Sequence, residues 1–270
     1  MTGYLPRCWA NRLVTPVNAR ARMAGVMALV GMALAAAAAI VAPAQASNPA
    51  VDGDPVAPNV VLVLLDDTRY DDMVAMPEVR REIGDFGATF THFYSSFPLC
   101  CPARATLLTG QYPHNHGVLS NKAPQGGFKE FKDASTLATW LDPTYRTGLI
   151  GKYLNEYRPP YTPPGWDEWM VPKWVYSYTG SSWWIDQGPA GAYKSLPGYQ
   201  TDTMGTLASD FISRSAPSPE PFFLYTSIVA PHDGSPRTDD PSWYSGPSPY
   251  VDPKYRDLFA GQGTGDPSFN

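Results

Sequence analysis

The sequence predicts an α/β fold in which helices flank a mixed, mostly parallel β-sheet. Three apolar runs carry this prediction, because each has the length and continuity of a strand covered on both faces. These runs are residues 59–65 (NVVLVLL), 147–151 (TGLIG) and 221–229 (PFFLYTSIV). Helix-forming stretches occupy residues 73–86, 135–141 and 201–214. Strands that alternate with helices are typical of parallel sheets.

Three other elements are expected along the chain. Residues 59–65 are expected to form a fully buried, central strand. Residues 89–94 (TFTHFY) alternate between polar and apolar side chains, which predicts a short strand. Residues 159–199 are rich in Pro, Gly, Trp and Tyr, and we interpret them as a hairpin excursion packed on the sheet. A wall of aromatic rings that stacks sugars is the alternative, although irregularly spaced aromatic residues are more often core.

The first 46 residues have the pattern of a secretory signal peptide. Residues 1–22 contain four arginines and no acidic residue, residues 23–41 are apolar and alanine-rich, and Ala44-Gln45-Ala46 forms a cleavage site. A membrane anchor is the alternative, and the cleavage site favours removal of the segment. Residues 47–57 then form a polar linker. The sequence therefore predicts a protein that is secreted or held in the cell envelope, with no membrane contact after cleavage.

The charge balance limits the partners of the protein. The whole chain has a formal net charge of −5, and removal of the arginine-bearing leader makes the remainder more acidic. An acidic protein has no general attraction for nucleic acids or other polyanions. A polyanionic ligand would therefore need a local basic pocket.

A distinctive turn lies at residues 98–110 (PLCCPARATLLTG). Pro102 is suited to the first position of a helix, and Gly110 is suited to its C-terminal cap. The sequence thus predicts that Cys100 and Cys101 lie at a helix N-terminus, where free N–H groups and the helix dipole favour an anion. Arg104 follows within the first turn and adds a donor for an oxyanion. The turn predicts a nucleophile beside a site for a phosphate-like or sulfate-like group.

Cysteine usage agrees with a chemical role for this turn. The chain has three cysteines, and Cys8 lies in the predicted signal peptide. Adjacent cysteines such as Cys100 and Cys101 rarely bridge each other. An exported chain that has no disulfide framework and places two cysteines in one turn favours chemistry over structure.

The same turn resembles the signature of the type I sulfatases. The shared residues are Cys100-x-Pro102-x-Arg104 and Leu107-x-Thr109-Gly110, with Ala103 where the family usually has serine. Residues 111–116 (QYPHNH) resemble the subgroup of N-acetylglucosamine-6-sulfatases and heparan endosulfatases. The resemblance implies an alkaline-phosphatase-like fold. It also implies that a formylglycine-generating enzyme oxidises Cys100 to formylglycine (3-oxoalanine) during maturation.

Polar residues follow each of the three predicted strands, and ligands bind at the carboxyl ends of strands in open α/β sheets. Asp66 and Asp67 follow the first strand, Lys152 the second and His232 the third. Two adjacent carboxylates are costly to bury unless a cation neutralises them, so a divalent metal site is one interpretation and a helix N-cap is the other.

The resemblance gives each of these residues a role. It implies that Asp66, Asp67 and the formylglycine of Cys100 bind Ca²⁺. It implies that Arg104, together with Lys152 of the Gly-Lys-Tyr-Leu run and His232 of the Pro-His pair, is catalytic. His116 directly follows the nucleophile helix, and we expect it to contact the substrate.

The resemblance extends from about residue 58 to the end of the chain and matches the first half of a sulfatase. Residues 58–235 are the expected N-terminal part of a sulfatase domain, and residues 236–270 are a Pro-, Ser- and Gly-rich excursion. No Asp-Asn or Asp-His dipeptide follows His232, although the family uses such a pair to complete its metal site. The sequence therefore predicts an incomplete calcium site and a chain truncated before the C-terminal half of the fold.

The leading hypothesis is a sulfuric ester hydrolase that removes sulfate from a sugar, such as N-acetylglucosamine 6-sulfate or another glycan sulfate. A phosphodiester or phosphonate hydrolase of the same superfamily is the first alternative. An inactive, truncated remnant that binds sulfated glycans is the second.

Overall fold

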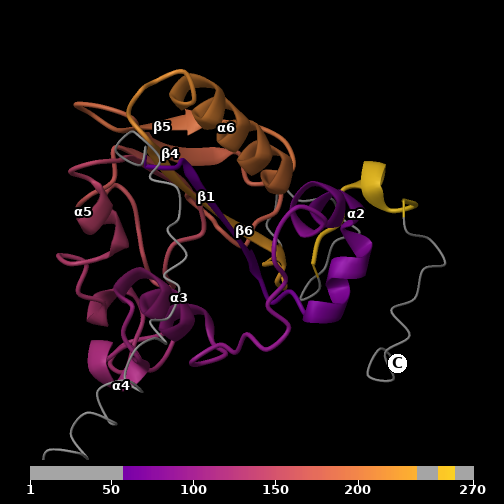
Figure 1. The fold of residues 1–270 in the computed structure, drawn as a ribbon. Coiled ribbons are helices and arrows are strands. Elements are labelled where there is room, and N and C mark those ends of the chain that lie inside the picture. Colours follow the sequence, from indigo (N-terminus) through magenta and orange to yellow (C-terminus); the bar gives the residue numbers. More distant parts are fainter. Residues whose placement is uncertain (1–56, 236–248, 259–270) are drawn as a thin grey trace, which may run out of the picture. The chain divides into compact units, whose positions relative to one another are not determined.

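The computed structural model describes residues 57–235 and 249–258. The predicted signal peptide, nearly all of the predicted linker and most of the predicted excursion at 236–270 lie outside these residues. The described part contains a six-stranded sheet with the strand order β1-β6-β2-β3-β4-β5 (Figure 1). The strands are β1 (Val60–Asp66), β2 (Arg146–Gly151), β3 (Glu168–Pro172), β4 (Ser182–Asp186), β5 (Ala192–Ser195) and β6 (Phe222–Pro231).

Four of the strands are parallel, which confirms the predicted fold class. β6 lies between β1 and β2 and pairs with both in parallel, and β3 continues the parallel part beside β2. β4 and β5 then add antiparallel strands at the other edge. The segment 159–199 therefore extends the main sheet, whereas the sequence predicted a hairpin excursion packed on it.

Side chains alternate between two cores, one on each face of the sheet. On β6, Phe223 and Tyr225 belong to one core, and Phe222 and Leu224 belong to the other. Helix α3 (Cys100–Thr109) and helix α5 (Leu137–Leu141) cover the first face, and helix α6 (Gln200–Ser215) covers the second (Figure 1). This period of two explains why the strand sequences are continuously apolar.

The tryptophans of the 159–199 segment belong mainly to the core. Trp169 and Trp183 are fully buried, and Trp166 is 9% exposed, whereas Trp174 is exposed. The interpretation as core packing is thus confirmed for most of the segment, and Trp174 is the exception.

Strand β1 corrects the sequence prediction. It is parallel, as expected, but it forms an edge of the sheet within the described residues and is not central. Val61 and Val63 are 45% and 50% exposed, while Leu62 and Leu64 pack against the first core. The apolar run could not reveal this difference, because a strand with one covered face and a strand with two can have the same apolar sequence.

The segment between β1 and α3 is also less regular than predicted. A 3₁₀ helix (Tyr70–Ala75), one α-helical turn α2 (Pro77–Val79) and a π-helical turn (Arg80–Gly84) replace the single helix expected at 73–86. Pro77 separates the first two because proline has no N–H for a continuous helix. The strand expected at 89–94 does not form, and those residues are exposed turn and coil.

The other predicted helices are confirmed within a few residues. α5 begins after Thr136, whose N–H donates to the hydroxyl of Thr139 at 2.9 Å. α6 covers the expected 201–214 segment with one residue more at each end. A short helix α4 (Pro113–His116) follows α3 and ends at Gly117 in the left-handed conformation. Within residues 57–235 and 249–258, none of the helices has the length and hydrophobicity needed to cross a bilayer.

Candidate active site

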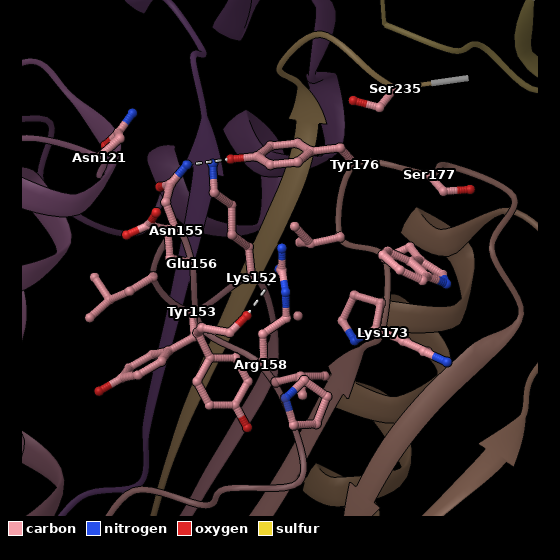
Figure 2. Close-up of a pocket in the computed structure, with 18 of the residues that line it drawn as sticks. Asn121, Lys152, Tyr153, Asn155, Glu156, Arg158, Lys173, Tyr176, Ser177 and Ser235 are labelled. Atoms are coloured by element: carbon pink, nitrogen blue, oxygen red, sulfur yellow. Dashed lines mark hydrogen bonds between the residues drawn. The ribbon is translucent and has the colours of Figure 1, made fainter. Parts of the chain in front are cut away.

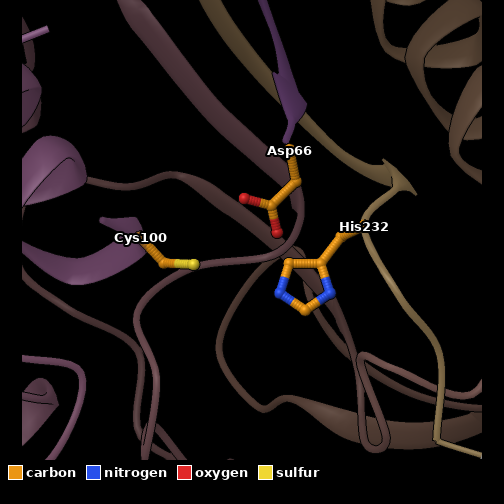
Figure 3. A group of neighbouring side chains, drawn as sticks. All are labelled: Asp66, Cys100 and His232. Atoms are coloured by element: carbon orange, nitrogen blue, oxygen red, sulfur yellow. The ribbon is translucent and has the colours of Figure 1, made fainter. Parts of the chain in front are cut away.

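Three predicted site residues meet at the carboxyl ends of the parallel strands. The side-chain ligand atoms of Asp66, Cys100 and His232 all lie within 4.8 Å of one another (Figure 3). Asp66 is the last residue of β1, Cys100 is the first residue of α3, and His232 follows β6. The site is therefore assembled from three elements that are far apart in the sequence.

Strand register explains why Asp66 and His232 are close. A shift between Leu65 and Asp66 places Asp66 beside Pro231 of β6, and His232 is the next residue. In the adjacent strand pair, which joins β2 to β6, Gly151 at the end of β2 lies beside Ser227 of β6. Lys152 therefore leaves the sheet at the same end as Asp66 and His232.

Helix α3 presents Cys100 to this cluster. The helix begins at Cys100, so Pro102 occupies its third position and not its first as predicted. Proline is tolerated there because the first four N–H groups of a helix have no partner within the helix. Asn121 accepts one of these donors, the N–H of Cys101, at 2.9 Å. Gly110 ends the helix with φ 65°, as the sequence predicted.

Arg104 is a buried organiser of the site. Its Nη1 donates to the carbonyl oxygen of Lys152 at 2.9 Å, to the hydroxyl of Ser227 at 2.5 Å and to the hydroxyl of Tyr225 at 3.3 Å. Its Nη2 lies 3.4 Å from the carboxylate of Asp66 and has no hydrogen-bond acceptor among the described residues. A buried donor of this kind is suited to receive an oxyanion.

Lys152 provides a second buried cation. Its ammonium group binds the carboxylate of Asp66 and lies 4.7 Å from the ring centroid of Tyr176. Burial and the neighbouring Arg104 lower the pKa of Lys152, but Asp66, Tyr176 and Cys100 outweigh them, so the net shift is upward. Lys152 is therefore charged at neutral pH.

His232 is held in one orientation. Its Nδ1 lies 2.7 Å from the carbonyl oxygen of Asp233, so this nitrogen donates, and Nε2 faces Cys100 and Asp67. The hydrogen bond with Cys100 is the main cause that raises the pKa of His232 to about 9, against the opposing effect of burial. The ring of Tyr176 lies 4.8 Å from that of His232, between centroids.

The two neighbouring cysteines have different environments. Burial raises the pKa of Cys100, but the hydrogen bond from His232 and the charge of Lys152 outweigh burial and lower it overall. Cys101 is fully buried, and burial raises its pKa to about 11. Its sulfur accepts the N–H of Asn155 at 3.0 Å. These shifts favour the thiolate form at Cys100 over Cys101. Both are free cysteines.

Asp67 lies beside the three-residue cluster and not within it. It has φ 62°, a left-handed conformation that aspartate tolerates better than most residues, and its side chain is 60% exposed. One carboxylate oxygen lies 3.6 Å from Nε2 of His232. Asp66 and Asp67 are oxygen donors that fit a calcium ion. They would supply part of its usual shell of about six to eight oxygen atoms.

His116 packs against α3 and does not belong to the cluster of Asp66, Cys100 and His232. Its Nδ1 accepts the N–H of Val118 at 3.1 Å, and its Nε2 lies 3.1 Å from the hydroxyl of Thr106. Burial lowers the pKa of His116. Both ring nitrogens therefore have protein partners, and the role of His116 as a substrate contact stays a prediction.

Several residues at the site were not identified from the sequence. Tyr176 contacts both Lys152 and His232, and its hydroxyl accepts the side-chain amide of Asn155 at 2.8 Å. Ser227 fixes Arg104. Asn155 could have been suspected, because it follows Lys152 by three residues. Tyr176 lies in an aromatic-rich segment that has no local signal of a site.

The fold and the site together define the class of protein. A mostly parallel sheet that gathers a helix-borne cysteine, a carboxylate, two buried cations and a histidine at its strand ends has an alkaline-phosphatase-like fold. The chain belongs to the sulfatase family, because the family model described as Sulfatase matches residues 58–264.

Relatives with curated names agree with this assignment. The chain is 36% identical over 189 residues to an extracellular sulfatase SULF-1 homolog of Drosophila melanogaster. The match covers 65% of this chain and 16% of the relative. It is 36% identical over 206 residues to the N-acetylglucosamine-6-sulfatase of Capra hircus, and the match covers 69% of this chain and 35% of the relative. For the human protein of the same name the identity is 34%, and the match covers 69% of this chain and 36% of the relative.

A solved structure supports the fold. The yidJ protein of Bacteroides fragilis has a TM-score of 0.55 and 24% identity, and the match covers 67% of this chain and 45% of that chain. The chain therefore spans less than half of the length of these relatives and of this solved structure.

Proposed function

We propose that the protein hydrolyses a sulfate ester on a sugar and that Cys100 is the position of the nucleophile. The observation that carries the proposal is the convergence of Asp66, Cys100 and His232 within 4.8 Å, beside the buried cations Lys152 and Arg104. A nucleophile position flanked by fixed cations is suited to a tetrahedral anion. Membership of the sulfatase family makes sulfate the expected anion.

The proposed chemistry requires two groups that the residues would hold. Asp66, Asp67 and the oxygen that replaces the sulfur of Cys100 would bind Ca²⁺. A hydrated formylglycine supplies a hydroxyl nucleophile when calcium is bound, because a divalent cation lowers the pKa of the hydroxyl. The formylglycine-generating enzyme is accordingly a proposed partner during maturation.

The remaining residues bind and orient the substrate. Nη2 of Arg104 is a buried donor beside one carboxylate oxygen of Asp66, and the ammonium group of Lys152 binds the other oxygen. Together they would hold the sulfate oxygens as negative charge increases on them. Nδ1 of His232 donates its hydrogen bond to the carbonyl oxygen of Asp233. Nε2 therefore remains available to give a proton to the departing sugar alcohol.

The proposed substrate is a glycan sulfate, and the proposed location is outside the cell. The similarity to proteins named N-acetylglucosamine-6-sulfatase supports an amino sugar as the reacting unit. The similarity to proteins named extracellular sulfatase supports secretion, in agreement with the predicted signal peptide.

The test combines mass spectrometry with activity. The chain is produced in a host that modifies other sulfatases, and the peptide that contains Cys100 is weighed. We expect the loss of mass that accompanies replacement of a thiol by an aldehyde. We also expect calcium-dependent release of nitrophenol from nitrophenyl sulfate, abolished by Cys100→Ala. An unmodified thiol together with no sulfate release would refute the proposal.

A further inference from the structure

The backbone of His232 is fixed at both of its polar groups. Its N–H donates to the carbonyl oxygen of Val229 at 2.9 Å, within the turn at the end of β6. Its carbonyl oxygen accepts the hydroxyl of Tyr178 at 2.5 Å, from a residue 54 positions earlier in the chain. Tyr178 lies in the loop between β3 and β4. The hydroxyl of Tyr178 therefore ties His232 to a different part of the sheet.

A second hydrogen bond joins the same two segments. The N–H of Ser235 donates to the carbonyl oxygen of Tyr176 at 2.8 Å, and both residues line the cavity beside the site (Figure 2). Residues 176–178 and 232–235 are thus linked at two points. The ring of Tyr176 also lies 4.8 Å from the imidazole of His232, between centroids. The loop after β3 therefore contacts both the backbone and the ring of His232.

Two other tyrosines hold the ring of Tyr178. Tyr178 is 2% exposed, and its ring centroid lies 5.9 Å from that of Tyr199 and 6.3 Å from that of Tyr250. The hydroxyl of Tyr199 donates to the carbonyl oxygen of Tyr250 at 3.2 Å, which links the two supporting residues. Tyr199 directly precedes α6, and Tyr250 belongs to the described segment 249–258. Close packing of this kind leaves a side chain one position, so the hydroxyl of Tyr178 is fixed.

Packing alone does not account for this hydroxyl. A phenylalanine would fill nearly the same volume in the cluster, and a buried hydroxyl is costly unless it has a partner. The partner of Tyr178 is the carbonyl oxygen of His232. A proton donor must lie within hydrogen-bond reach of the atom that it protonates, and a displacement of about 1 Å slows such a step strongly. The hydrogen bond is therefore suited to hold a proton donor in place.

We propose that Tyr178 is a positioning residue for His232. The inference rests on the proposed function, in which the bond between sulfur and the sugar oxygen breaks and its electron pair stays on that oxygen. Nε2 of His232 gives the oxygen its proton. Tyr178 does not touch the substrate, and it acts by holding the backbone of His232 so that Nε2 points to the departing oxygen. Through Tyr250, the segment 249–258 supports the site from outside it.

The test compares two substrates in the calcium-loaded, modified protein. Nitrophenyl sulfate releases a stable phenolate that departs without a proton, whereas N-acetylglucosamine 6-sulfate releases an alcohol that needs one. Tyr178→Phe removes the hydroxyl and keeps the ring. Tyr157→Phe is the matched control, because the buried side chain of Tyr157 also donates its hydroxyl to a backbone carbonyl, that of Tyr161.

We expect Tyr178→Phe to lower kcat for N-acetylglucosamine 6-sulfate by at least about tenfold, because protonation of the departing alcohol is impaired. KM for this substrate and both constants for nitrophenyl sulfate should stay within about twofold, since binding and the nucleophile are unchanged. Tyr157→Phe should leave the ratio of the two activities unchanged. Equal loss on both substrates in Tyr178→Phe, or no loss on either, would overturn the inference.

A spectroscopic measurement separates this inference from the proposed function. In chain whose histidine rings carry an isotopic nitrogen label, the NMR signals of His232 are identified by their loss in His232→Gln. Tyr178→Phe should shift these signals, and Tyr157→Phe should leave them in place. Absence of sulfate release by the unsubstituted protein would count against the proposed function alone. Unshifted His232 signals in Tyr178→Phe would overturn the positioning role whether or not sulfate is released.

Discussion

The carboxylate of Asp66 binds the ammonium group of Lys152, although strand β6 lies between the strands that carry them. Both side chains are almost fully buried, at 6% and 2% exposed. The pair crosses the end of β6 and fixes the positions of β1 and β2 at the site. It also neutralises two charges that would each be costly to bury alone.

The first prediction concerns this buried pair. Lys152→Met is expected to lower the free energy of unfolding by about 3–5 kcal/mol, because it removes the cation that lies closest to the buried carboxylate of Asp66. Adding Asp66→Asn should recover part of the loss. Urea unfolding of the two single variants and the double variant measures the coupling. The exposed pair of Arg81 and Glu78 is the control and should couple by about 0.2–1 kcal/mol. Equal coupling in the two cycles would contradict the buried pairing.

The second prediction concerns thiol reactivity in chain produced without modification of Cys100. Because the pKa of Cys100 is lowered and that of Cys101 is raised to about 11, iodoacetamide should alkylate Cys100 selectively at pH 7. His232→Ala removes the hydrogen bond that lowers the pKa of Cys100, so its alkylation should slow at pH 7 and recover at higher pH. Peptide mass spectrometry follows each thiol. An unchanged pH profile in the variant would show that His232 does not stabilise the thiolate.

The third prediction concerns pH-dependent stability at the opposite end of the sheet. Glu168 begins β3 and accepts hydrogen bonds from Arg146 at 2.5 Å, Gln187 at 2.7 Å and Arg214 at 2.9 Å. Burial raises the pKa of Glu168, but these donors outweigh it and lower the pKa to about 2 from the ordinary 4.5. The folded state therefore gains stability from Glu168 above pH 4.5 and loses it as the pH falls toward 2.

Glu168→Gln removes this contribution. At pH 7 the free energy of unfolding of the variant should be about 2 kcal/mol lower than that of the wild type, because hydrogen bonds to a charged group are lost. The difference should shrink as the pH falls below 4.5. Urea titrations at several pH values test this, and two parallel stability curves would contradict it.

The fourth prediction concerns Gly151, the residue before Lys152. Its φ is 102°, and an added methyl group would overlap the carbonyl oxygen of Ser227. Gly151→Ala should therefore destabilise the fold by about 2–4 kcal/mol through backbone strain and overlap. Gly205→Ala is the control, because this helical glycine has open space around it, and that variant should gain up to about 1 kcal/mol. A harmless Gly151→Ala substitution would indicate a wider separation of β2 and β6.

The sequence predicted the elements whose local pattern is unambiguous. The apolar runs of β2 and β6 and the length of α6 were placed within a few residues, and Gly110 was identified as the end of α3. The convergence of Asp66, Cys100, Lys152 and His232 could be expected because each follows a strand or begins a helix at the same end of a parallel sheet.

Local sequence patterns do not predict contacts between residues that are far apart in the chain. The edge position of β1 depends on which strand lies beside it, and its apolar run does not encode that order. Tyr176 reaches Lys152 and His232 from an irregular loop after β3, so neither periodicity nor spacing identifies it. Helix α3 begins two residues before Pro102, where Asn121 accepts the N–H of Cys101, and this contact between residues 20 positions apart has no local signal in the sequence.

The pairing of β1 with β6 has a consequence for the time at which the site is built. The N–H of Phe222 donates to the side chain of Asn59 at 3.0 Å across 163 residues of sequence. A ribosome that adds about 5–20 residues per second needs on the order of ten to thirty seconds to make that stretch. Contacts so distant in sequence also form slowly. Cys100 is therefore translated well before β6 can enclose it, and during that interval its side chain is accessible on an open chain.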